Sequence, residues 1–106
     1  MGYLPPMDRE RARAALAALG NATRLDMVEL IAKAGDAGAL PSALADAVGI
    51  PRNLLGAHLL VLEKSGIVTA ERQGRNRICR IDAPTLSALA EFIEEYSRAS
   101  DVRQDP

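Results

Sequence analysis

The sequence predicts a mainly α-helical domain of five helices with a small β-hairpin between the fourth and the fifth helix. The chain has 106 residues, the size of one domain, and its 48% hydrophobic and 25% charged residues are an ordinary globular balance. Apolar residues recur at helical spacing in five segments, which glycine, proline or capping residues delimit. A strand pattern replaces this spacing over residues 67–81. We expect residues 1–106 to form a single domain, with flexible tails at 1–7 and 100–106.

Three helices are predicted in the first half of the chain, over about residues 8–20, 21–35 and 41–49. Asp8 and Asn21 have side chains that can cap the first two helices, and a proline suits the first turn of the third. A loop over Asp36–Gly38 separates the second helix from the third. The predicted core faces are Ala12, Ala15, Leu16 and Leu19 in the first helix; Leu25, Val28, Ile31 and Ala32 in the second, with Met27 and Leu30 beside them; and Leu44, Ala47 and Val48 in the third.

The second half begins with a fourth helix that Pro51 opens and Gly66 closes, with Leu55, Leu59 and Leu62 as its buried stripe. Two strands then follow over residues 67–72 and 77–81. Between them, Gln73-Gly74-Arg75-Asn76 is predicted to form a turn in which Gly74 and Asn76 can take a positive φ. A final helix begins at Pro84, and its predicted stripe is Leu86, Leu89, Ala90 and Ile93.

Charge is distributed unevenly along the chain. The net charge is −1, but residues 51–80 hold six basic against two acidic side chains, whereas residues 81–106 hold two against six. A basic block in a nearly neutral chain is typical of a surface that faces a polyanion. The alternative is that this block is solvated surface without a partner.

Several classes of protein are excluded by composition. A single cysteine, Cys79, rules out an internal disulfide framework and a cysteine-based zinc site within one chain. Aromatic residues are only 3%, which argues against stacking platforms for single-stranded nucleic acid. We find neither a secretory signal nor 18 consecutive apolar residues, so we expect a soluble, cytoplasmic protein. One histidine and no glycine-rich phosphate loop argue against an enzyme, and we expect no cofactor.

The order of these elements predicts a winged helix-turn-helix. A short helix, the tight turn Gly49-Ile50-Pro51 and a longer helix form the helix-turn-helix, and the basic hairpin after it forms the wing. Four segments carry a family pattern in the same order: ALGNATRL at 18–25, LADAVGIP at 44–51, HLLVLEKSGIV at 58–68, and QGR at 73–75 with the strand that follows. Together they resemble the arsenic-repressor (ArsR/SmtB) family of winged-helix regulators over about residues 10–97.

This resemblance implies a homodimeric transcriptional repressor that binds a near-palindromic operator in double-stranded DNA and releases it when an inducer arrives. In that family the first and last helices form the dimer interface, which here implies residues 8–20 and 84–99. The apolar residues of the last helix cover more of its circumference than one small domain needs, which agrees with this role. A thicker monomer core is the alternative. The implied interface residues are Ala12, Leu16, Leu89, Phe92, Ile93 and Tyr96.

The chain departs from the metal-sensing members that it resembles. Some of them carry a Cys-x-Cys pair in the first motif helix, where this chain has Leu40-Pro41-Ser42-Ala43. Others place an Asp/His/His/Glu zinc set on the last helix, which here has glutamates and no histidine. A third group ends that helix with adjacent cysteines for arsenite, where this chain has Glu95-Tyr96-Ser97. We therefore expect no metal site and an unidentified non-metal inducer.

The fourth helix is the predicted reading helix. Arg52 suits guanine, Asn53 suits adenine and Ala57 suits a thymine methyl. Family members usually show Ser and Thr where this chain has Leu54, Gly56 and Ala57, so either small residues allow close approach or the wing contributes more. The predicted DNA contacts are Arg52, Asn53, Leu54, Gly56, Ala57, His58, Arg72, Arg75, Asn76 and Arg77.

Three of these interpretations keep an alternative. His58 matches the family's helix histidine near DNA, but a satisfied structural histidine at the edge of the core is equally consistent. Arg72, Arg75, Arg77 and Arg80 suit a wing that contacts four phosphates per subunit, although a solvated hairpin tip has the same composition. Nearby arginines favour a redox-active Cys79 thiolate, but a small apolar residue in the wing strand fits better.

A second function remains open. Leu54, Ala57 and Leu60 are apolar at positions where polar base readers are usual. This pattern is also consistent with a winged helix that has become a protein-interaction module with weak or no specific DNA binding. Binding to DNA fragments at low salt separates the two functions.

Overall fold

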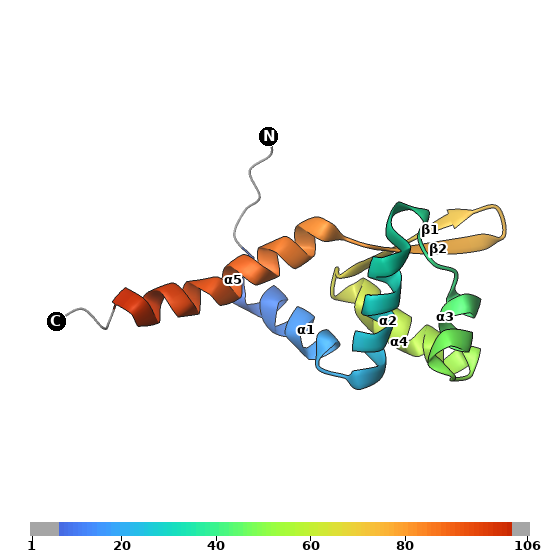
Figure 1. The fold of residues 1–106 in the computed structure, drawn as a ribbon, viewed down its shortest axis with the longest axis horizontal. Helices are drawn as coiled ribbons and strands as arrows, with labels where there is room; N and C mark the ends of the chain where they lie inside the picture. Colours follow the sequence, from blue (N-terminus) through green and yellow to red (C-terminus); the bar gives the residue numbers. More distant parts are fainter. Residues whose placement is uncertain (1–6, 103–106) are drawn as a thin grey trace.

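The structure, a computed structural model, describes residues 7–102 and has the predicted order of elements (Figure 1). The helices are α1 (Arg9–Leu19), α2 (Ala22–Ala34), α3 (Pro41–Val48), α4 (Arg52–Lys64) and α5 (Ala83–Val102), with a 3-10 turn, η1 (Gly35–Ala37), after α2. The antiparallel strands β1 (Val68–Gln73) and β2 (Asn76–Ile81) form the hairpin between α4 and α5. The predicted fold class, a winged helix-turn-helix with five helices, is confirmed.

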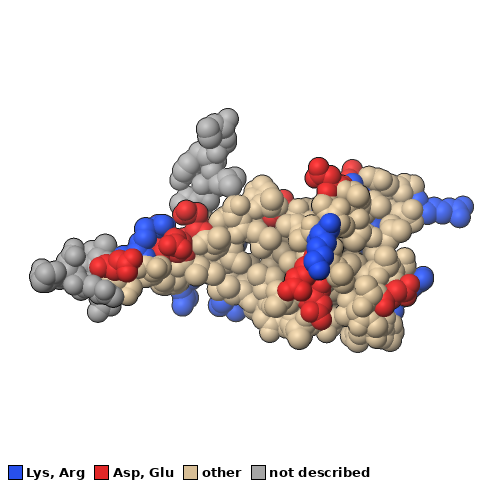
Figure 2. All heavy atoms as spheres, in the orientation of Figure 1, with Lys and Arg blue, Asp and Glu red and all other residues tan. Residues whose placement is uncertain are grey.

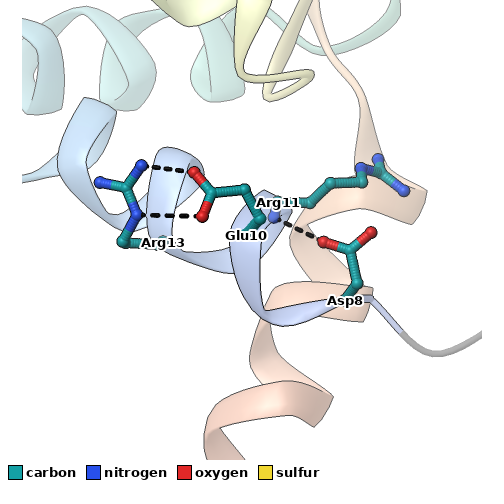
Figure 3. A network of polar contacts seen from close by, with 4 residues as sticks. All are labelled: Asp8, Glu10, Arg11 and Arg13. Carbon is teal, nitrogen blue, oxygen red and sulfur yellow. Dashed lines mark hydrogen bonds and ion pairs between the residues drawn. The ribbon is translucent and has the colours of Figure 1, made fainter.

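The predicted capping residues begin the first two helices. The Asp8 carboxylate accepts a hydrogen bond from the backbone N–H of Arg11 at 2.7 Å, and the Asn21 side chain accepts one from Arg24 at 3.1 Å. Figure 3 shows the Asp8 cap beside the ion pair between Glu10 and Arg13 in the first turn of α1. Each cap satisfies a backbone donor that the helix itself leaves free.

One core joins α2, α4 and the hairpin. Its largest fully buried side chains are Met27, Ile31, Leu55, Leu59, Leu62, Ile67, Val68 and Cys79. The leucine stripe of α4 is therefore confirmed. The expected face of α2 is confirmed at Val28 and Ile31, which are buried, but wrong at Leu25 and Ala32, which are exposed; Met27 is buried in their place. Because apolar residues cover overlapping faces of α2, its packing against α3, α4 and β2 decides which face is buried.

The other helices also differ in part from their predicted faces. In α3 the inward alanine is Ala45, and Ala47 is exposed. In α1 the alanines at 12, 15 and 18 are buried, and Leu16 is exposed. In α5 Leu89 is buried, while Ala90 and Ile93 are exposed. The face of α1 that packs on the core is therefore made of alanines, with Leu19 partly buried against the core.

The hairpin closes through a two-residue turn between Gln73 and Asn76, which are paired across the strands. Gly74 has φ of 63°, but Asn76 does not take the positive φ expected for it. A third segment joins the hairpin, since the N–H and C=O groups of Ala39 and Cys79 are hydrogen-bonded to each other at 2.9 and 2.8 Å. At Gly38, with φ of 76°, a Cβ would overlap the Ile78 side chain, so this approach requires glycine.

The C-terminal half of α5 extends away from the rest of the chain, opposite to the end that holds α3 and the hairpin (Figure 1). The radius of gyration is 16.0 Å, against about 13 Å for a compact domain of this length.

Within the expected tails, Met7 is buried and residues 100–102 continue α5, so these residues do not belong to flexible tails. Residues 1–6 and 103–106 lie outside the described residues. Among residues 7–102, no helix combines the length and the apolar character that a membrane span requires.

Gly56 gives a test of the packing of α4. It lies in the helix interior, and nothing stands within 4 Å of the position that a Cβ would occupy. Gly56→Ala should therefore raise the free energy of unfolding by about 0.5–1 kcal/mol, because alanine loses less conformational entropy in a helix. Thermal unfolding followed by circular dichroism at fixed protein concentration measures the change.

Gly49→Ala is the matched control. Its Cβ would also enter open space, but Gly49 has φ of 78°, so this substitution should lower stability. Two substitutions with the same sign would contradict this account of α4.

Candidate nucleic-acid interface

The helix-turn-helix is closed by a short, hydrogen-bonded turn. Gly49 ends α3 in the left-handed conformation, and its N–H and that of Ile50 both donate to the carbonyl of Ala45, at 2.8 and 3.1 Å. Pro51 then precedes the first turn of α4 in an extended conformation. Only three residues separate the two helices, so α3 and α4 are held at one fixed angle.

The N-terminal half of α4 presents the predicted reading residues to solvent. The side chains of Leu55 and Leu59 are directed inward, so helical periodicity directs the intervening positions outward. The predicted contacts that are exposed on α4 are Arg52, Asn53, Leu54, Gly56 and Ala57. Leu60 is 51% exposed and continues the face of Asn53 and Gly56, although it is not among the predicted contacts. The i, i+3 and i+7 spacing of Asn53, Gly56 and Leu60 is the signal that identifies it.

His58 is half-buried and differs from its neighbours on α4. Its Nδ1 lies 3.1 Å from Nη1 of Arg24, whose Nε donates to the Ala18 carbonyl at 2.7 Å. A guanidinium only donates, so Nδ1 of His58 accepts. These bonds link α4 to the start of α2 and favour the structural alternative for His58. Arg24 was not predicted as a functional residue, since nothing in its local sequence pattern indicates a partner 34 positions away.

Two of the four hairpin arginines are bound within the chain. Arg77 Nη2 donates to Glu63 Oε1 at 2.8 Å, which ties β2 to the last turn of α4. Arg80 donates to Glu71 Oε1 across the hairpin and to the Asp36 carbonyl, both at 2.7 Å. That all four arginines contact phosphates stays a prediction, but in the chain alone Arg77 and Arg80 already tie the hairpin to α4 and to the Asp36 carbonyl.

The other two arginines, Arg72 and Arg75, are exposed toward the tip of the hairpin, as is Asn76. In the described part of the chain, residues 7–102, neither arginine has an acidic partner within 4 Å. Figure 2 shows basic side chains projecting from the end of the molecule that holds the hairpin. Charge without an internal partner is available for an external anion.

Cys79 belongs to the core of the hairpin. It is 0% exposed, and its backbone is paired with both Ala39 and Ala70. Burial raises the pKa of the Cys79 thiol, and the nearby charge of Arg77 does not offset this. A raised pKa disfavours the reactive thiolate, so the geometry favours a small core residue over a redox switch.

The predicted interface residues of α1 and α5 fall into two groups. Ala12 and Leu89 are buried in the chain's own core and are not available to a partner, which corrects their assignment. Leu16, Ile93 and Tyr96 are exposed, and the half-buried Phe92 packs edge-on against Tyr96 with ring centroids 5.6 Å apart. We call Leu16, Phe92, Ile93 and Tyr96 the apolar ridge.

Comparison with known proteins supports the same fold. A family model described as a helix-turn-helix domain matches residues 19–71. An ArsR-like transcriptional regulator from Rhodococcus sp. superposes with a TM-score of 0.78 at 26% identity, covering 89% of this chain and 86% of that one. The antimony-specific repressor AntR gives 0.62 at 26% identity, covering 95% and 99%.

A homodimeric winged helix-turn-helix DNA-binding domain from Mycobacterium bovis superposes with a TM-score of 0.65 at 23% identity, covering 97% of this chain and 94% of that one. Among curated protein sequences, none matches this chain. The family model spans half of the chain, and the structural likeness extends over both terminal helices. The chain thus belongs to the ArsR-like family of winged helix-turn-helix proteins, whose members are DNA-binding transcriptional regulators rather than enzymes.

Proposed function

We propose that this chain is a homodimeric repressor that binds a near-palindromic DNA operator through α4 and the tip of the hairpin. The observation that carries the proposal is the pairing of two surfaces: the exposed N-terminal half of α4, which begins with Arg52 and Asn53, and the unpaired arginines of the hairpin. An α-helix fits the major groove, and a basic hairpin beside it contacts the backbone.

The two surfaces have different tasks in this proposal. Arg52 can donate two hydrogen bonds to guanine and Asn53 can pair with adenine, so α4 discriminates between sequences. Arg72 and Arg75 neutralise phosphates and add affinity for any duplex. Arg77 and Arg80 keep the hairpin at a fixed position relative to α4, since both are bound to groups of the body or of the opposite strand.

Dimerisation through the apolar ridge supports a near-palindromic operator. The ridge lies on α1 and on the part of α5 that extends from the body, and the relative from Mycobacterium bovis is described as homodimeric. A two-fold axis through the ridge relates two copies of α4. Two such helices reach half-sites about 34–36 Å apart along one face of the duplex.

The signal that releases the DNA is assigned to a non-metal ligand. AntR, a related repressor, is described as antimony-specific. Soft ions are bound by several thiolates, but this chain has one cysteine, and that cysteine is buried. The single histidine is engaged by Arg24. The donor set of this chain therefore does not fit a thiol-rich site.

Arg52→Ala and Arg75→Ala test the division of tasks. Arg52→Ala should weaken binding to a selected operator by about tenfold or more while leaving non-specific binding nearly unchanged, because it removes a base contact. Arg75→Ala should weaken both kinds of binding alike. Gel-shift titrations with an operator and with a scrambled duplex measure the four affinities. Equal losses for the two variants would reject this division, and no retarded duplex even at low salt would favour the protein-interaction module.

Salt dependence tests the role of Arg77. Arg77→Ala should leave the slope of log affinity against log salt nearly unchanged, because Glu63 already neutralises this arginine. Arg75→Ala should reduce the slope by about 0.9 per subunit, the value for one phosphate contact. Glu63→Gln should increase it, since Arg77 is then free to bind a phosphate. An Arg77→Ala slope that falls as far as that of Arg75→Ala would show that Arg77 exchanges Glu63 for DNA.

Ile93→Asp tests the apolar ridge. Ile93 is 45% exposed in one chain, and burying a carboxylate between two copies should raise the dissociation constant of the dimer by about tenfold or more. Sedimentation velocity measures the change. Leu25→Asp is the matched control, because Leu25 is 44% exposed on α2 and lies outside the ridge. Dimers that are unaffected by Ile93→Asp would contradict the proposed interface.

A further inference from the structure

The outward face of α4 is apolar where it would meet a duplex. From Asn53, the positions at helical spacing on this face are Gly56, Ala57 and Leu60, all of them exposed. Leu54 is also exposed and flanks Ala57. No hydroxyl, amide or charge follows Asn53 on this face until Lys64, three turns further along the helix. We call Leu54, Gly56, Ala57 and Leu60 the apolar reading face.

Charge complementarity indicates what covers the apolar reading face. Arg52 and Lys64 flank it on α4, and the hairpin adds the unpaired Arg72 and Arg75. An apolar protein surface would leave these cations without partners. A polyanion that also presents apolar groups satisfies both, and in the major groove the only apolar group on a base edge is the C5 methyl of thymine.

We propose that the apolar reading face recognises thymine methyl groups, so the preferred DNA carries thymines at the half-site positions that face Ala57 and Leu60. This inference rests on the proposed function and specifies its ligand. Arg52 and Asn53 supply hydrogen bonds at one end of the half-site, and the apolar side chains select methyl groups at the other. Gly56 leaves open space, which lets the groove approach the backbone of α4.

Replacement of thymine by deoxyuridine tests the proposal, because uracil keeps every hydrogen-bonding group of thymine and lacks only the methyl. Duplexes are first selected from a random library with the full chain. The selected half-site is then synthesised with deoxyuridine at single positions. Each methyl in contact should contribute about fourfold to affinity, as expected for one buried methylene-sized group. Deoxyuridine outside the half-sites should have no effect.

Two variants assign the effect to α4. Leu60→Ala should reduce the thymine-to-uracil ratio toward one at its own position. Leu25→Ala, at an exposed leucine on α2, should preserve the full ratio. Selected half-sites without thymine, or equal affinity for the two bases at every position, would overturn the methyl-recognition proposal alone. Binding to no duplex at low salt would overturn the proposed function itself.

Discussion

Burial of one side of α4 is the constraint on which the interface depends. Leu55, Leu59 and Leu62 are almost completely removed from solvent, and truncating any one of them to alanine should cost about 2–5 kcal/mol. Because α4 has a regular helical period, fixing these three side chains also fixes the direction of every other side chain on it. The exposed face from Asn53 to Leu60 is therefore a direct consequence of the core, and a rotation of the helix would expose leucines of the stripe.

Further contacts fix the position of α4 relative to its neighbours. Arg24, in the first turn of α2, connects the end of α1 to His58 in the middle of α4, and Glu63 connects the last turn of α4 to the hairpin. Arg72 and Arg77 stand directly opposite each other across the strands, where like charges repel. The Glu63 carboxylate offsets this repulsion on the Arg77 side. Arg72 has no acidic partner within residues 7–102, and in the proposed complex a DNA phosphate would neutralise it.

The fold, and with it the exposed face of α4 that forms the candidate interface, could be predicted from sequence because they follow from local signals. Caps at Asp8 and Asn21, the leucine stripe of α4 and the glycine turn of the hairpin each act within a few residues. Partners that are distant in the chain could not be predicted in this way. Arg80 bonds to Asp36, and Arg77 bonds to Glu63, only because the fold brings them together. In the sequence the four arginines of the hairpin look equivalent. In the structure, Arg77 and Arg80 are bound within the chain, whereas Arg72 and Arg75 are exposed.

The exposed apolar side chains of this chain argue for two separate partners. Leu16, Ile93 and Tyr96 lie on α1 and α5, while Leu54 and Leu60 lie on α4. In the proposed dimer, one additional copy seated on the ridge would cover the first group and, by two-fold symmetry, the same group of its partner. That arrangement leaves α4 uncovered in both copies. The cations around α4 then favour a negatively charged second partner. On α5, by contrast, Glu91 and Glu95 are already paired with Arg98, so these charges call for no external partner.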